Sequence, residues 1–262
     1  MTKLNHHRTG SGEPLVLVHG VGSHWQVWEP LFELLTDSFE VIAVDLPGFG
    51  GSETLEHTTV STLADALVGF LAAEGLERPH LAGNSMGGGI VLDLAARGLA
   101  RSVTAYSPIG CWDTAGRVWC QQALGNAKRL TKALHPAVPA IFGTAAGRSA
   151  FLGLVFGRPW DITPQVGIDT AEGVLGAGGF DAALASFTEF RLPDHTAVAD
   201  IPVTVAWGNR DILLTYATQS RRAREVLPGA RHVTLPGSGH TPFYDDPAGC
   251  ARLLLDQATP SR

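Results

Sequence analysis

Cysteines, charged side chains and long apolar runs are scarce in this chain of 262 residues. Lys and Arg number 19 against 25 Asp and Glu, and no basic block gathers them, so a nucleic-acid partner is not expected. No run reaches the roughly 18 apolar residues of a membrane helix, so no membrane span is expected. The opening MTKLNHHRTGSGEP has no apolar core of a secretory signal, which favours a cytoplasmic location.

The three cysteines, Cys111, Cys120 and Cys250, are too widely spaced for a disulfide framework or a zinc pattern. We expect each to be a small buried apolar residue. What the chain does contain is the ordinary composition of a folded domain, with 45% hydrophobic residues. Its length suits one domain that carries an insertion.

Short apolar runs alternate with helical windows along most of the chain. Strands are predicted at Leu15–His19, Val41–Asp45, His80–Gly83, Val103–Tyr106, Val203–Trp207 and His232–Leu235. Helices are predicted at Trp28–Leu35, Val60–Glu74, Met86–Ala96, Ala217–Val226 and Pro247–Gln257. This alternation predicts an α/β fold, with a mostly parallel central sheet and helices on both faces. The segment before Leu15 receives no assignment.

The alternation breaks between Ile109 and Pro193, in a stretch rich in Gly, Ala and Pro. Helical pieces are predicted at Arg117–Leu134 and Asp181–Phe190. An irregular loop of this length would be anomalous in a compact domain, so a helical insertion is predicted instead. The expected organisation is a core of residues 1–110 and 194–262 with a helical cap of residues 111–193.

A nucleophile motif, G-x-S-x-G, is formed by Gly83-Asn84-Ser85-Met86-Gly87, with a predicted strand before it and a predicted helix after it. The tight turn between them should hold Ser85 at strained dihedrals, and the two glycines remove side chains that would clash there. Ser85 would then project at a helix N-terminus, where the dipole favours a developing oxyanion. Ser85 is therefore the predicted nucleophile.

A serine hydroxyl needs a neighbouring base at neutral pH. Among the ten histidines, His240 follows the last predicted strand, so it should lie on the same rim of the sheet as Ser85. His232 falls within that strand and is expected to be structural. The remaining histidines weighed for this role have no comparable placement, namely His6, His7, His57, His80, His135 and His195.

The base needs an acid that fixes its tautomer. Asp211 follows the predicted strand Val203–Trp207, and the chain order of serine, aspartate and histidine is the one expected for this motif. Asp113 and Asp45, each just past a strand, are the rival acids. Two further acids, Asp245 and Asp246, follow His240 too closely to orient its ring and are expected to cap the last helix.

Two backbone N–H groups should face the oxyanion. The N–H of Met86 follows the nucleophile directly, and the second is expected from the loop after an early strand, at Val21 with Gly22 as the alternative. His19 is expected to brace that loop through hydrogen bonds. The glycine-rich stretch Asp45–Ser52 fits neither a phosphate cradle nor a dinucleotide fingerprint, and is expected to shape the sheet rim.

Taken together, HGVG at His19–Gly22, DLPGFGGS at Asp45–Ser52, GNSMGG around Ser85, WGNRD ending at Asp211 and GSGH ending at His240 resemble the α/β-hydrolase superfamily. The resemblance spans almost the whole chain and lapses only in Ile109–Pro193, where that superfamily inserts its cap. It implies an eight-stranded sheet, a helical lid, an active site between the two, and no need for a metal or an organic cofactor.

The resemblance leaves the substrate open, because the superfamily includes esterases, lactonases, C–C bond hydrolases, cofactor-free haloperoxidases, hydroxynitrile lyases and hormone receptors. Ser85 argues against its dehalogenases, which have an aspartate nucleophile. The loop HGVGSH and Thr241 after His240 differ from the C–C hydrolases.

The main hypothesis is a serine esterase that forms an acyl-enzyme on a small, mainly apolar substrate, an expectation drawn from the cap aromatics Trp112, Trp119 and Trp160. The alternatives are a C–C hydrolase, a haloperoxidase-type enzyme, a lyase, and a ligand receptor that turns its ligand over slowly. A small-molecule substrate is the expected partner, with a homodimer left open.

Overall fold

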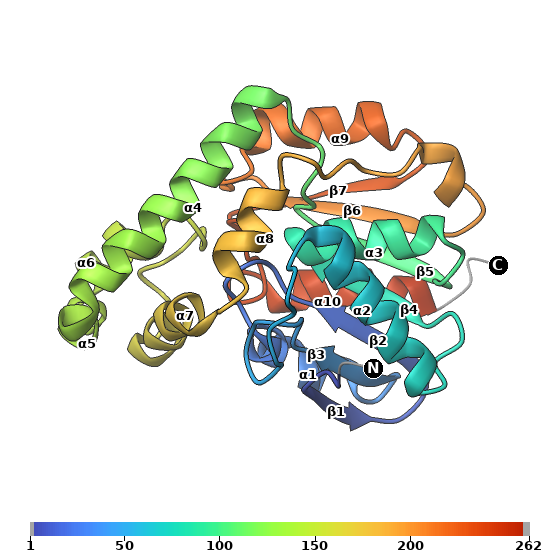
Figure 1. Ribbon diagram of the computed structural model, residues 1–262, viewed down its shortest axis with the longest axis horizontal. Helices are drawn as coiled ribbons and strands as arrows, with labels where there is room; N and C mark the ends of the chain where they lie inside the picture. Colours follow the sequence, from blue (N-terminus) through green and yellow to red (C-terminus); the bar gives the residue numbers. More distant parts are fainter. Residues whose placement is uncertain (1–2, 259–262) are drawn as a thin grey trace.

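A mostly parallel sheet runs through the centre of the molecule (Figure 1). The computed structural model describes residues 3–258, and in this range the sheet has seven strands in the order β1-β3-β2-β4-β5-β6-β7. The strands are β1 (His6–Gly10), β2 (Glu13–Val18), β3 (Phe39–Val44), β4 (His80–Asn84), β5 (Ser102–Tyr106), β6 (Val203–Gly208) and β7 (Arg231–Leu235). Only β1 is antiparallel to its neighbour, β3. The predicted α/β fold is confirmed.

All six predicted strands are present, and the seventh is the unassigned N-terminal segment. The implied count of eight strands is wrong for the described residues. The three described residues before β1 are too few for another strand, and the backbone of Asn5 binds the loop after β3 instead. The Asn5 carbonyl accepts a hydrogen bond from the Asp45 N–H at 2.8 Å, and the Asn5 N–H donates to Ser52 Oγ at 2.8 Å.

Helices cover both faces of the sheet. One layer contains α1 (Glu29–Leu35) and α10 (Pro247–Ala258), and the other contains α2 (Val60–Ala73), α3 (Met86–Ala96) and α9 (Arg221–Val226). Alternate residues of β2 divide between the two layers, with Leu15 and Leu17 in one core and Val16 and Val18 in the other. A strand that is buried on both faces therefore reads as one continuous apolar run.

The predicted helices of these layers are present with small changes at their ends. A 3₁₀ turn (Trp25–Trp28) precedes α1, and a π-helix (Tyr216–Ser220) precedes α9, so the predicted helix Ala217–Val226 is α-helical only in its second half. The Thr59 hydroxyl accepts the Thr62 N–H at 3.1 Å and caps α2.

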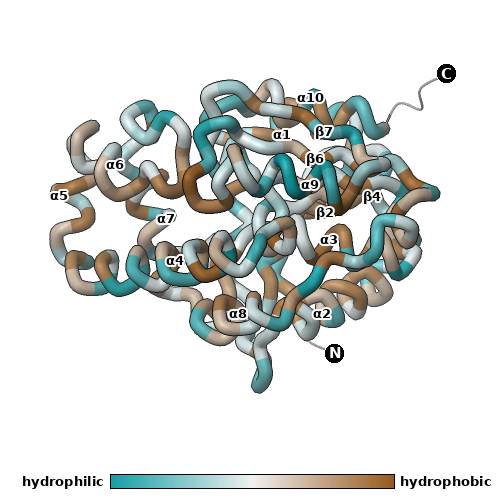
Figure 2. The backbone as a smooth tube through the Cα atoms, turned by 90° about the horizontal axis from the view of Figure 1, so that it is seen from above, coloured by the Kyte–Doolittle hydropathy of each residue, from teal (hydrophilic) through white to brown (hydrophobic). Residues whose placement is uncertain are grey.

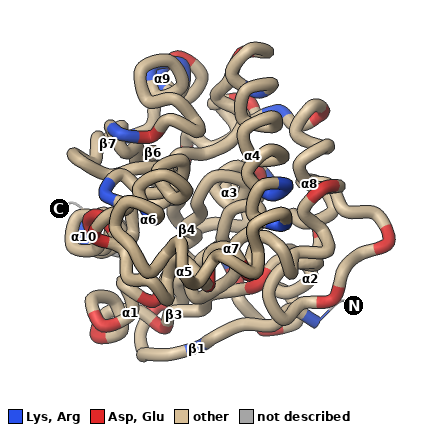
Figure 3. Tube along the Cα trace, turned by 90° about the vertical axis from the view of Figure 1, so that its left-hand side faces the viewer, with Lys and Arg blue, Asp and Glu red and all other residues tan. Residues whose placement is uncertain are grey.

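Between β5 and β6 the chain forms α4 (Thr114–Leu134), α5 (Val138–Phe142), α6 (Ala145–Leu152), α7 (Pro164–Gly176) and α8 (Phe180–Ser186), with 3₁₀ turns at His135–Ala137 and His195–Val198. Helices α4 to α7 extend to one side of the sheet (Figures 1 and 2). Seen from that side, basic positions lie on α4 and acidic positions on α1 (Figure 3). The helices α5 to α7 share a small apolar core that includes Val138, Phe142, Leu152 and Phe156.

None of the described helices is long and apolar enough to cross a membrane. The three cysteines are free and buried, as expected.

At the amino ends of the strands, a polar cluster joins β2, β4 and β5. The ring of His80, 4% exposed, lies between Ser102 Oγ, 2.7 Å from Nδ1, and Glu13 Oε2, 2.9 Å from Nε2. Arg101 binds the other carboxylate oxygen of Glu13. Since a carboxylate only accepts, Nε2 carries the proton and neutral Nδ1 accepts the Ser102 hydroxyl.

Candidate active site

Ser85 lies at the junction between β4 and α3, as the motif predicts. Its backbone has φ 56° and ψ −113°, a conformation that L-residues rarely adopt. A Cβ on Gly83 would collide with the Gly87 carbonyl, and a Cβ on Gly87 would collide with the Val18 carbonyl of β2. The two glycines therefore allow the sharp turn that places Ser85 at the carboxyl end of the sheet.

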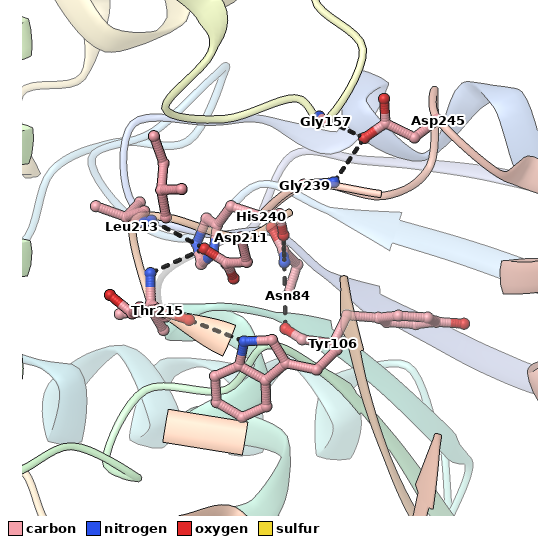
Figure 4. Close-up of polar contacts among 12 residues, drawn as sticks. Asn84, Tyr106, Gly157, Asp211, Leu213, Thr215, Gly239, His240 and Asp245 are labelled. Atoms are coloured by element: carbon pink, nitrogen blue, oxygen red, sulfur yellow. Dashed lines mark hydrogen bonds and ion pairs between the residues drawn. The ribbon is translucent and has the colours of Figure 1, made fainter. Parts of the chain in front are cut away.

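The loops after β6 and β7 bring Asp211 and His240 together (Figure 4). His240 Nδ1 lies 2.8 Å from Asp211 Oδ2, and the Asp211 side chain is fully buried. The other carboxylate oxygen accepts the N–H groups of Leu213 and Leu214 at 3.0 and 2.9 Å. Because the carboxylate only accepts, His240 carries its proton on Nδ1 and keeps the Nε2 lone pair free.

The rival acids bind elsewhere. Asp113 caps α4 by accepting the Gly116 N–H at 2.8 Å. Asp45 accepts the N–H groups of Trp25 and Gly51 at 2.7 and 2.8 Å, which shapes the rim loop as expected for this stretch. Of the three candidates, only Asp211 contacts His240.

The loop before Ser85 is tied directly to the loop that carries His240. Asn84 Nδ2 donates to the carbonyls of Tyr106 and His240 at 3.2 and 3.0 Å (Figure 4). Asn84 was not singled out from the sequence, because the motif leaves its position unspecified. The Asn84 side chain thereby connects the serine turn to the backbone of His240.

Asp245 holds the histidine loop against the helical segment, and the expectation that it caps the last helix is wrong. Its buried carboxylate accepts the N–H groups of Gly157, Arg158 and Gly239 at 2.8, 2.9 and 2.9 Å (Figure 4). Three converging N–H donors outside α10 draw the side chain away from the helix end. Asp246 does cap α10, since it accepts the Gly249 N–H at 2.9 Å.

Val21 and Met86, the predicted oxyanion donors, come from the two loops that meet at Ser85. Within residues 3–258 neither N–H has a hydrogen-bond acceptor. Gly22 has φ 77°, and a turn that closes from the Ser23 N–H to the Gly20 carbonyl at 3.2 Å holds the loop. The N–H of Gly22 is also without an acceptor in this range, so both alternatives for the second donor stay predictions.

His19 braces this loop, as expected. Its Nδ1 donates to the Gly20 carbonyl at 2.7 Å, and its Nε2 accepts the Leu46 N–H at 3.0 Å. Burial lowers the pKa of His19 to about 4, so the ring is neutral at physiological pH. His232, expected to be structural, binds the Leu227 carbonyl at 2.9 Å.

A cavity of about 370 Å³ opens over Ser85 and His240, and both residues line it. Its apolar wall includes Val21, Leu124, Val155, Phe156, Val166, Val174, Leu213 and Tyr244. Trp112, Trp119 and Trp160 do not line it. Trp112 packs on Phe187, and the other two are about half exposed. Phe156, another aromatic residue of the predicted cap, does line the cavity. His24, a lining residue, was overlooked in the sequence.

A sequence model of the alpha/beta hydrolase family matches residues 15–253. The chain belongs to this family. It is similar to the pimeloyl-[acyl-carrier protein] methyl ester esterase of Vibrio vulnificus, with 27% identity over 98% of both chains. It is also similar to epoxide hydrolase EphH of Mycobacterium tuberculosis, with 31% identity over 74% of this chain and 92% of that one.

The solved esterase RhEst1 from Rhodococcus sp. ECU1013 has the same fold. It superposes with a TM-score of 0.77 at 24% identity and covers 99% of this chain and 95% of its own.

Proposed function

We propose that this protein is a serine hydrolase that cleaves a carboxylic ester bond of a small, mainly apolar substrate. The observation that carries the proposal is the Asp211–His240 pair. His240 Nε2 is buried and has no hydrogen-bond partner among the described residues, and His240 and Ser85 line the same cavity. The ester assignment also draws on the similarity to a methyl ester esterase.

In the proposed reaction, Ser85 Oγ attacks the ester carbonyl carbon and its proton passes to His240 Nε2. The carbonyl oxygen becomes an oxyanion, which the N–H groups of Val21 and Met86 bind. His240 then gives its proton to the departing alkoxide, and an acyl-enzyme remains on Ser85. Water attacks this ester while His240 takes its proton. His240 then gives that proton to Ser85 Oγ as the carboxylic acid leaves, which restores both residues. Asp211 orients the ring and stabilises the imidazolium throughout.

In this proposal residues 111–193 act as the cap. The support is the set of contacts from the segment after α6 to the histidine loop: the Thr241 N–H donates to the Val155 carbonyl at 2.9 Å, and Asp245 joins Gly157 to Gly239. A cytoplasmic location and a homodimer stay predictions from the sequence.

The test is a panel of short p-nitrophenyl esters together with labelling by a fluorophosphonate. We expect hydrolysis and one label on Ser85, and we expect the Ser85→Ala variant to lose both while its circular dichroism spectrum is unchanged. Ser102→Ala is the matched control, because Ser102 contacts His80 and does not line the cavity over Ser85, and it should keep both.

Labelling that persists in Ser85→Ala would refute the nucleophile. Cleavage of diketones or cyanohydrins without ester hydrolysis would replace the esterase by a C–C hydrolase or a lyase. Tight ligand binding without turnover of any ester would indicate a receptor.

A further inference from the structure

The charged side chains around the cavity are of one sign. Glu29 on α1, together with Asp169 and Glu172 on α7, lines it, whereas no Lys or Arg of the described residues does. Two histidines, His24 and His240, also line the cavity. Figure 3 shows acidic positions on α1, the helix that carries Glu29.

Two of these carboxylates have no cationic partner within residues 3–258. Glu29 makes no ion pair or hydrogen bond through its side chain there, and Asp169 accepts only from the neutral amide of Gln165 at 2.7 Å. Glu172 differs, because His135 Nε2 lies 2.9 Å from its carboxylate. The unpaired negative charge at the cavity therefore comes from Glu29 and Asp169.

Both carboxylates act on the same aromatic ring, that of Tyr244. Burial together with the charges of Glu29 and Asp169 raises the pKa of Tyr244 to about 12, so the phenol stays neutral. The Phe156 ring meets that of Tyr244 edge to face, at 5.7 Å between centroids, and both line the cavity. Aromatic rings beside carboxylates form an environment that attracts organic cations.

The cavity is also built to receive a reacting group. His240 is 4% exposed, and its Nε2 has no partner among the described residues. This buried nitrogen belongs to the same cavity wall as Glu29, Asp169 and Tyr244. A substrate engaged at His240 would therefore share this cavity with the carboxylates.

Building on the proposed esterase function, we propose that Glu29, Asp169 and Tyr244 make this cavity selective for esters that carry an ammonium group. Attraction between a trimethylammonium group and the carboxylates favours such a substrate, and the ring adds a cation–π contribution. An ester with a carboxylate or sulfonate at the same place meets repulsion instead. The three residues would set specificity, while Ser85 and His240 perform the chemistry.

The experiment compares isosteric substrates. Choline butyrate is paired with its carbon isostere, which has a tert-butyl group in place of trimethylammonium, and a second pair carries the same groups on the acyl side of a methyl ester. At low salt we expect kcat/KM to be about tenfold higher for the cationic member of at least one pair. The preference should shrink to about twofold at roughly 0.5 M NaCl, because salt screens exposed charges.

Charge-neutral variants locate the effect. Glu29→Gln and Asp169→Asn should each lower the ratio of cationic to neutral kcat/KM about threefold, as expected for exposed charges. Glu33→Gln removes a charge from the same helix at a position that does not line the cavity, and should leave both rates unchanged. A ratio near one in both pairs, or a ratio unaffected by the two cavity variants, would overturn the proposal.

A binding measurement separates this proposal from the esterase proposal. Calorimetry on Ser85→Ala should show tighter binding of choline butyrate than of its isostere, or of the cationic methyl ester than of its isostere. Neutral esters hydrolysed at Ser85 without cation preference would refute the specificity alone. Cation preference in binding without hydrolysis of any ester would refute the esterase alone, and the absence of both would refute both.

Discussion

At each end of the β-sheet a histidine binds a carboxylate, and a serine belongs to each cluster, yet the surroundings of the two clusters differ. At the carboxyl ends, His240 binds Asp211 beside the cavity of Ser85. At the amino ends, His80 lies between Glu13 and Ser102. In both clusters the carboxylate requires a proton on the nearer ring nitrogen, so the other nitrogen is a potential base.

The clusters differ in everything around those three groups. Ser102 belongs to the regular strand β5, whereas Ser85 lies in a turn with φ 56° and lines a cavity, although both serines are buried. Ser85 has the N–H groups of Val21 and Met86 without acceptors in the adjoining loops. A serine bound to a histidine is therefore not yet a nucleophile, because catalysis also needs access and preorganised donors.

The acids of the two clusters give the largest expected contrast. Asp211→Asn should lower kcat for an ester about 10³- to 10⁴-fold, since an amide at this position favours the wrong histidine tautomer. Glu13→Gln, the matched change at the amino ends, should leave kcat within about twofold because it touches no substrate. Steady-state kinetics on both variants checks the contrast. Equal losses would show that the two ends are not functionally distinct, and a large loss in Asp113→Asn would replace Asp211 as the acid.

At the carboxyl ends of the strands, His19 differs from His240 because it holds a loop and has no proposed catalytic role. Its pKa lies near 6.5 in the unfolded chain and at about 4 when buried, so the unfolded state binds more protons between these pH values. The free energy of unfolding should therefore rise with pH across this window, by about 3 kcal/mol from this group.

An NMR titration should show the His19 ring uncharged down to roughly pH 5. Urea denaturation should show a shallower pH dependence in His19→Gln than in the parent protein. A His19 ring that titrates near pH 6.5 would contradict the prediction.

Asp245 and Asp246 are adjacent acids that should behave differently. Asp245→Asn leaves one acceptor oxygen for three N–H donors, so the His240 loop should lose its hold on the Val155–Gly157 segment. We expect kcat and the fluorophosphonate labelling rate of Ser85 to fall about tenfold, in the range found for supporting residues.

Asp246→Asn removes the same charge from the cap of α10, and Asn caps a helix about as well as Asp. It should leave both rates unchanged, which makes it the control. Similar rates in the two variants would remove Asp245 from the machinery that positions His240.

Much of the site could be predicted because the fold places the carboxyl ends of parallel strands on one rim. Three positions that follow strands, Ser85, Asp211 and His240, can meet for that reason, and the structure joins the last two directly. The same logic left Asp113 as a rival acid, and the structure shows that Asp113 is occupied in capping a helix.

Other features of the fold could not be predicted from the neighbouring residues in the sequence. β1 is a polar edge strand, HHRTG, whose pairing with β3 supplies the stability that its composition lacks. The helices α5 to α7 are short, and their apolar residues form a core only when the three helices pack together. The three tryptophans of this region do not line the cavity, and only tertiary packing decided where they lie.

By itself the sequence determined the order of strands and helices, the serine turn and the rim on which its partners lie, because these depend on periodicity, glycine geometry and chain direction. Tertiary structure alone decided that Asp245 and Asn84 hold the histidine loop, that His80 and Ser102 meet at the opposite end, and that two unpaired carboxylates line the cavity. Those contacts join residues far apart in the chain, and which of them form depends on how helices and loops pack over the sheet.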